Sequence, residues 1–215
     1  MSNRTKKITM VAMLCAIAYA SVAVCRIPLF NFLEYEPKAI IITIGGFIMG
    51  PLTAFLVSLI VSTVELITIS TTGFIGWIMN LLANCAFACT AAIIYKKKHT
   101  FSGAIIGLTA GTLCMTAIML LWNYLIIPLY MGYPREAVAA MLIPIFLPFN
   151  LIKGAINTGI TMLLYKPIVT ALRKSGLIAG SSTTIVGKRN IGTILISLTV
   201  IATGILIALS LNHVI

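Results

Sequence analysis

Long apolar stretches separated by short polar segments dominate the pattern of this sequence. They lie at residues 8–25, 39–64, 74–95, 102–129, 138–165 and 191–211. A helix needs about 20 apolar residues to cross the hydrocarbon core of a bilayer, which is about 30 Å thick. The pattern therefore predicts an all-α integral membrane protein.

The second stretch is interrupted by a turn signal. Pro51 follows Gly50 and disfavours helical backbone in the residue before it. We therefore expect two passes here, a short one over residues 39–49 and a longer one that begins at Pro51. Because a helix of eleven residues spans only about 16 Å, the short pass should be shielded by protein.

The distribution of positive charge also favours two passes. Basic residues cluster at residues 4–7, 96–98 and 166–189. Cytoplasmic loops of membrane proteins are rich in Lys and Arg. The three clusters share one side only if residues 39–64 cross twice, which predicts six transmembrane helices in the core with the N-terminus in the cytoplasm.

A polar linker divides the chain into two parts. Residues 1–174 form the predicted six-helix core, and residues 175–190 form a cytoplasmic linker. Residues 191–215 contain a further apolar stretch without internal charge. We expect this part to form one extra C-terminal transmembrane helix that anchors the protein in lipid.

Composition excludes several classes of function. The chain is 60% hydrophobic and 9% charged, whereas about a quarter of the residues in a soluble domain are charged. The net charge of +11 could suggest nucleic acid, but the basic residues flank apolar stretches, so we expect no nucleic-acid partner. Catalysis by paired carboxylates is disfavoured because the chain has no Asp and only four acidic residues, Glu34, Glu36, Glu65 and Glu136.

The remaining candidate catalytic and metal-binding residues are poorly placed. His99 lies in a predicted cytoplasmic loop and His213 lies at the C-terminal end, so neither can reach an intramembrane site. The cysteines are odd in number, and Cys85 and Cys89 lack the spacing and the His partners of a zinc site. We therefore expect no catalytic residues and no metal site.

The most informative polar residue is Lys153, which lies midway along the stretch 138–165. A cation at the centre of a span usually faces a cavity or a partner. Asn150, Lys153, Asn157 and Thr161 follow the spacing of one helical stripe. Two interpretations are open: Lys153 contacts a solute, or it forms a structural pair with Glu65.

Three amides lie in other spans. Asn80 and Asn84 are one turn apart, and Asn84 is expected to form a hydrogen bond between helices. Asn123 lies toward the outer end of its span, beside aromatic residues. These aromatic residues fit either an interfacial belt or a platform for a ligand: Trp122, Tyr124 and Tyr130.

Together these residues predict an amide-rich pocket with one cation near the outer leaflet. Such a pocket suits a neutral or weakly acidic planar solute. The chain contains no GxxxxGK[ST] motif, so any ATP-driven step needs a partner protein. The first span offers a small-residue face for docking, formed by Ala12, Ala16 and Ala20.

The sequence over residues 8–174 resembles the substrate-binding S component of energy-coupling factor (ECF) vitamin transporters, most closely the riboflavin-specific type. Three motifs carry the resemblance: Ile44-Gly45-Gly46-Phe47 with Gly50-Pro51, Asn123-Tyr124 with Pro128-Leu129-Tyr130, and Pro148-Phe149-Asn150-Leu151-Ile152-Lys153-Gly154.

The resemblance implies six helices and an outward-open pocket beneath a mobile outer loop. It also implies docking through the first helix to a membrane coupling subunit that carries two ATPases. Asn123, Asn150 and Lys153 match positions implied to bind the flavin ring, and Asn80 lies near a matching polar position.

The implied function is a high-affinity riboflavin-binding subunit of an ATP-driven importer in the cell membrane. Three alternatives remain at this point. The chain could serve a different vitamin, act as a stand-alone facilitator of solute entry, or be a small membrane enzyme or assembly protein.

The predicted topology is directly testable. A reporter fused after Lys98 should be active in the cytoplasm, and one inserted within residues 132–135 should be active outside. Reporter activity in cells gives the location of each site. The opposite result at both sites would mean that residues 39–64 cross the membrane once.

Overall fold

The computed structural model of the protein describes residues 3–30, 33–174, 195, 197–199, 201–204 and 206. The described residues up to 174 form a bundle of helices with one small hairpin. The elements are α1 (Asn3–Val24), β1 (Ile27–Phe30), β2 (Leu33–Tyr35), α2 (Lys38–Met49), α3 (Pro51–Thr68), α4 (Gly73–Lys97), α5 (Phe101–Met131), α6 (Arg135–Met141), the π-helical η1 (Leu142–Phe146) and α7 (Leu147–Lys174).

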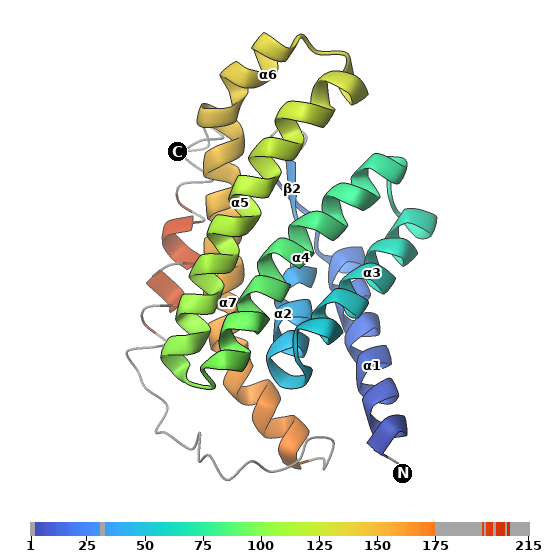
Figure 1. The fold of residues 1–215 in the computed structure, drawn as a ribbon, viewed down its shortest axis with the longest axis vertical. Helices are drawn as coiled ribbons and strands as arrows, with labels where there is room; N and C mark the ends of the chain where they lie inside the picture. The colour runs from blue at the N-terminus through green and yellow to red at the C-terminus, as the bar shows by residue number, and fades with distance from the viewer. Residues whose placement is uncertain are drawn as a thin grey trace.

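The helices run up and down the long axis of the bundle (Figure 1). Five helical segments of the described chain are long and apolar enough to cross a membrane, with α6, η1 and α7 contributing one of them, and α2 is a shorter apolar helix. This confirms the predicted helical membrane protein. The start of α1 and the α4–α5 connection lie at one end, called here the N-terminal end, and β1–β2 lies toward the other, called the hairpin end (Figure 1).

The break between α2 and α3 lies where the sequence predicts it. Gly50 adopts a φ of 98°, which favours glycine, and Pro51 occupies the first turn of α3, where its missing N–H costs nothing. The short helix α2 would span only about 18 Å. It contacts α1, α3, α4 and α7 and is buried over most of its length, so protein shields it as expected.

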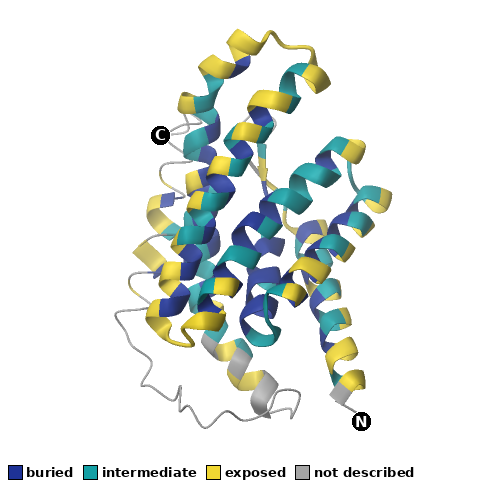
Figure 2. Ribbon diagram, viewed as in Figure 1, coloured by how far each residue is buried: buried dark blue, intermediate teal, exposed yellow. Residues whose placement is uncertain are grey.

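The tightest helix packing joins α4 and α5. A Cβ on Gly107 would lie 2.7 Å from the carbonyl oxygen of Ala91, and one on Gly111 would lie 2.5 Å from that of Phe87. Only glycine lets the two backbones approach so closely. The buried residues gather in this central part of the bundle, and the exposed ones cover its outer faces (Figure 2).

An aromatic cluster packs at the N-terminal end of the bundle. The Phe47 ring stacks at a tilt on Tyr95, with 4.5 Å between centroids, and meets Tyr165 edge-on at 5.7 Å. The hydroxyl groups of Tyr95 and Tyr165 share a hydrogen bond. This cluster links α2, α4 and α7 and fills the space between them.

The hairpin is the only non-helical secondary structure among the described residues. Its antiparallel strands pair Ile27 with Tyr35, and Tyr35 is buried against Phe149, Ile152 and Ile156 of α7. The hairpin therefore folds back onto the bundle. It covers the hairpin end next to α7.

The predicted linker 175–190 lies outside the described residues, as does much of the predicted seventh span. The described residues within 195–206 are helical. A Cβ on Gly159 of α7 would lie 3.1 Å from the carbonyl oxygen of Ser197, so this part packs closely on α7.

Candidate functional site

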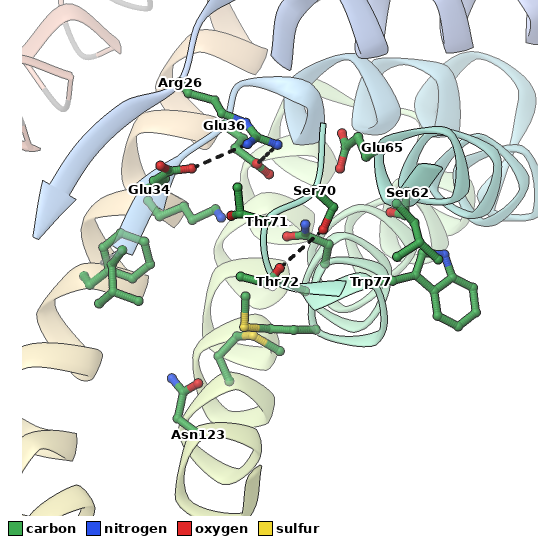
Figure 3. A pocket seen from close by; sticks show the side chains of 18 of the residues that line it. Arg26, Glu34, Glu36, Ser62, Glu65, Ser70, Thr71, Thr72, Trp77 and Asn123 are labelled. Atoms are coloured by element: carbon green, nitrogen blue, oxygen red, sulfur yellow. Dashed lines mark hydrogen bonds and ion pairs between the residues drawn. The ribbon is translucent and has the colours of Figure 1, made fainter. Parts of the chain in front are cut away.

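A pocket opens at the hairpin end between β2, α3, α4, α5 and α7 (Figure 3). Its empty volume, which includes the solvent space at its open mouth, is about 870 Å³. Part of its lining is apolar and can contact a flat ring: Leu33, Leu66, Met79, Ala83, Met119 and Phe149. The rest of the lining is polar and charged.

One polar wall, called here the amide wall, brings together the predicted pocket residues Asn80, Asn123, Asn150 and Lys153. They come from three helices, α4, α5 and α7, whose packing places distant parts of the sequence beside one cavity. Asn123 and Asn150 are buried, and Lys153 is partly buried. The wall offers amide donors, amide acceptors and one ammonium group.

Asn150 is oriented by its own helix. The π-helical turn η1 ends at Phe146, and the Asn150 side-chain nitrogen donates a 2.8 Å hydrogen bond to the carbonyl oxygen of Phe146. Single π-helical turns often occur at functional sites because they reposition side chains. The bond uses the Asn150 amide as a donor, which leaves its Oδ1 atom as an acceptor for the pocket.

Lys153 forms no ion pair within the described part of the chain. Its Nζ atom lies 5.7 Å from the ring centroid of Phe149, one turn earlier on the same helix. Glu65 is instead paired with Lys38. The interpretation of Lys153 as a structural partner of Glu65 is therefore wrong, and its ammonium group belongs to the pocket.

Two members of the predicted stripe do not line the pocket. Asn157 and Thr161 are fully buried further along α7. The Oδ1 atom of Asn157 accepts a 2.9 Å hydrogen bond from the Tyr35 hydroxyl, which ties the hairpin to α7. Asn84 is also buried, but its Nδ2 atom has no partner among the described residues, so the interhelical bond expected from it is absent there.

The aromatic residues beside Asn123 do not contribute to the pocket. Tyr124 and Tyr130 are 37% and 44% exposed on the outside of α5, which fits an interfacial belt. Trp122 packs against the core of α4 and α5. The aromatic side chains that do line the pocket are Phe149 and Trp77.

A network of charged residues also borders the pocket; we call it the charge network. It consists of Arg26, Glu34, Glu36, Lys38 and Glu65. The Lys38 Nζ atom lies 2.6 Å from Glu36 Oε2 and also binds Glu65 Oε2. Arg26 contacts Glu36 at 3.3 Å and Glu34 at 3.9 Å. Lys38 is only 1% exposed, so its contacts with Glu36 and Glu65 lie inside the protein, whereas Glu34 is half exposed.

The charge of Glu36 is maintained by its neighbours. Burial raises the pKa of its carboxyl group, but the positive charges of Lys38, Lys153 and Arg26 outweigh burial and hold the pKa below its ordinary value. Glu36 therefore stays ionised at neutral pH. Its carboxylate contacts both Lys38 and Arg26.

Sequence reasoning missed the charge network. Lys38 stands at the start of an apolar stretch, where a basic residue normally marks the membrane surface. Glu34 and Glu36 are close to it in sequence, but Glu65 is not. The acidic and basic residues at every second position, Glu34, Glu36 and Lys38, were the sequence signal that could have indicated this network.

The predicted docking residues lie on a different face of the protein. Ala12, Ala16 and Ala20 are all exposed on α1 and do not contact the pocket. This is the surface that the sequence assigns to a partner helix.

Comparison with known proteins identifies the family. Residues 6–165 match the family described as "ECF transporter, substrate-specific component". The chain belongs to this family of S components. It is therefore a substrate-binding, non-enzymatic transport subunit that couples with an ECF energising module.

Related proteins and one solved structure agree with this assignment. The S component is 29% identical over 174 residues to "Riboflavin transporter FmnP" of Bacillus subtilis strain 168, covering 75% of this chain and 91% of the relative. It is 27% identical over 180 residues to "Riboflavin transporter RibU" of Staphylococcus aureus strain TCH60, covering 80% and 95%. A solved structure described as "Structure and mechanism of the S component of a bacterial ECF transporter" superposes with a TM-score of 0.67 at 26% identity, covering 79% of this chain and 99% of that one.

The charge network of this S component should be sensitive to loss of its central cation. Lys38→Met leaves two buried carboxylates without their shared partner, so we expect a loss of about 3–5 kcal/mol in stability. Thermal unfolding of the detergent-purified protein measures the effect. Lys96→Met, at an exposed lysine in the last turn of α4, is the matched control and should leave the unfolding temperature unchanged. Equal stability of the two variants would contradict the role of Lys38.

Proposed function

We propose that this S component binds riboflavin as the membrane-embedded subunit of an ATP-driven vitamin importer. The observation that carries the proposal is the convergence of Asn123, Asn150 and Lys153 on one pocket, with the Lys153 ammonium group unpaired by any carboxylate of the described chain. The relatives named as riboflavin transporters support the same ligand.

The amide wall matches one edge of the flavin ring. Riboflavin presents a uracil-like edge with two carbonyl acceptors and one N–H donor between them. Lys153 supplies donors only, and the Asn123 amide can donate or accept. Asn150, whose nitrogen is bound to Phe146, supplies the acceptor that the ring N–H needs.

The remaining lining suits the rest of the ring and its lack of charge. Met79, Met119 and Phe149 offer apolar contacts for the ring faces and the dimethylbenzene end. The formal charges of Lys153 and the charge network cancel, since three basic residues stand beside three acidic ones. A neutral ligand leaves this balance undisturbed, whereas a cationic or anionic vitamin would not.

The proposed orientation follows from the predicted topology. The N-terminal end of the bundle lies in the cytoplasm and the hairpin end faces outside, so the pocket receives its ligand from outside the cell membrane. The α1 face of Ala12, Ala16 and Ala20 docks to a transmembrane coupling subunit, which carries two ATPase subunits. Residues 175–190 form the cytoplasmic linker and residues 191–215 the additional lipid-facing helix.

Substitution of Lys153 tests the ligand site. A hydrogen bond to a charged group contributes about 1.5–3 kcal/mol, so Lys153→Met should weaken riboflavin binding by roughly ten- to a hundredfold. Asn123→Ala and Asn150→Ala should each cost less, because a neutral bond is lost. Quenching of flavin fluorescence on titration with purified protein gives the dissociation constants. Undiminished affinity in Lys153→Met would refute the assignment of the pocket.

A pair of amides on α4 provides the control for that experiment. Asn80 lines the pocket, whereas Asn84, one turn further along, does not. Asn80→Ala should weaken riboflavin binding and Asn84→Ala should leave it within about twofold. If the protein bound another vitamin and not riboflavin, it would still be an S component, but the proposed substrate would be wrong.

The docking face can be tested separately from the pocket. Replacing both Ala16 and Ala20 by Leu should prevent close approach of a partner helix, so ATP-driven uptake should be lost while riboflavin binding stays at the parental level. Ala117→Leu, at an exposed alanine of α5, is the control.

Two results of the uptake experiment would contradict the docking proposal. Parental uptake by the double variant, with expression confirmed, would exclude this face of α1 as the docking surface. Uptake by the unmodified protein in cells that lack the ATPases would indicate a stand-alone facilitator.

A further inference from the structure

The α3 side of the pocket carries two buried acceptors that the protein itself leaves unused. Ser62 and Glu65 are one turn apart on α3, both line the pocket, and they are 1% and 2% exposed. Within the described chain, Ser62 Oγ and Glu65 Oε1 have no hydrogen-bond partner. Lys38 occupies the other carboxylate oxygen, Glu65 Oε2.

Such atoms are expensive to bury without a partner. An unsatisfied buried polar atom loses its hydrogen bonds to water and receives nothing in return. A carboxylate oxygen can only accept, so the missing partner of Glu65 Oε1 must be a donor. The group that satisfies it in the bound state has to bring an N–H or O–H into the pocket.

We propose that Ser62 and Glu65 bind the hydroxyl groups of a polyol tail carried by the ligand. This assignment rests on the proposed function, because riboflavin consists of a flat ring joined to a chain of hydroxyl groups. Each hydroxyl group donates one hydrogen bond and also accepts. The tail can therefore donate to Glu65 Oε1 and exchange a bond with the Ser62 hydroxyl.

The arrangement of the pocket separates a ring site from a tail site. Asn123 lies well apart from Glu65 and Ser62 across the pocket (Figure 3). A ring bound at the amide wall can thus direct its tail toward α3. The connecting loop adds three more hydroxyl residues to the lining, Ser70, Thr71 and Thr72, and the side-chain oxygens of Ser70 and Thr72 lie 3.5 Å apart.

A pair of flavins that differ only in the tail tests the proposal. Lumiflavin has the riboflavin ring with a methyl group in place of the polyol. The unmodified protein should bind riboflavin at least about tenfold more tightly than lumiflavin. Ser62→Ala should weaken riboflavin binding by about threefold to tenfold and leave lumiflavin binding unchanged. Fluorescence quenching measures all four dissociation constants.

A neighbouring serine supplies the matched control. Ser58 lies one turn before Ser62 on the same helix, is equally buried and does not line the pocket. Ser58→Ala should change neither dissociation constant. Glu65→Gln, which removes the negative charge while Lys38 keeps its contact with Glu36, should weaken riboflavin binding by about tenfold and again spare lumiflavin.

The possible outcomes separate the two proposals. If the unmodified protein binds neither flavin, the proposed function is wrong. If it binds both, but Ser62→Ala lowers both affinities equally or neither, the riboflavin assignment stands and the tail site is wrong. Should Glu65→Gln fail to fold, the ratio of the two affinities in Ser62→Ala decides alone.

Discussion

The hairpin end of this protein depends on the contacts of one buried cation, Lys38. It holds Glu36, which follows the hairpin, and Glu65 of α3, and Arg26 contacts Glu36 from the base of the hairpin. A charge removed from water is tolerated only when paired and hydrogen-bonded. Because Lys38 begins α2, this network ties the hairpin, α2 and α3 to one another. The pocket lies directly beside it.

The two ends of the bundle differ: one holds an open pocket and the other is closely packed. This difference explains how the protein can bind a solute without forming a channel for it. At the hairpin end, polar groups from several helices surround an open pocket. Toward the N-terminal end, Phe47, Tyr95 and Tyr165 pack together between α2, α4 and α7. The missing side chains of Gly107 and Gly111 let α5 approach the backbone of α4 closely. Ligand release on the far side therefore requires movement, which fits an S component that works with an energising module.

Much of this arrangement could be predicted from local patterns. Residues 39–64 were expected to cross twice because Gly50 and Pro51 interrupt them and because the basic clusters then share one side, and the structure has α2 and α3 with that break. Asn80, Asn123, Asn150 and Lys153 were expected beside one another, and they line one cavity. Of the two roles left open for the aromatic residues next to Asn123, the ligand platform is wrong, because successive residues of a helix lie about 100° apart and Trp122 and Tyr124 therefore face other directions than Asn123. Sequence reasoning did not find Lys38 as the partner of Glu65, because the burial of Lys38 depends on how α2 is enclosed.

The amino-acid sequence by itself determined the number, order and length of the helices, since each apolar stretch must satisfy its own backbone in lipid and each basic cluster acts on the loop that contains it. It also determined which chemical groups are available within the spans. Only the tertiary structure decided which of these groups meet. Lys38 and Glu65 are 27 residues apart, and Tyr35 and Asn157 are 122 apart, so their contacts exist only after α2 is enclosed by its neighbours and the hairpin folds onto α7. The unpaired acceptor atoms of Ser62 and Glu65 also result from the tertiary structure, because the packing of the neighbouring helices decides which buried side chains find a hydrogen-bond partner.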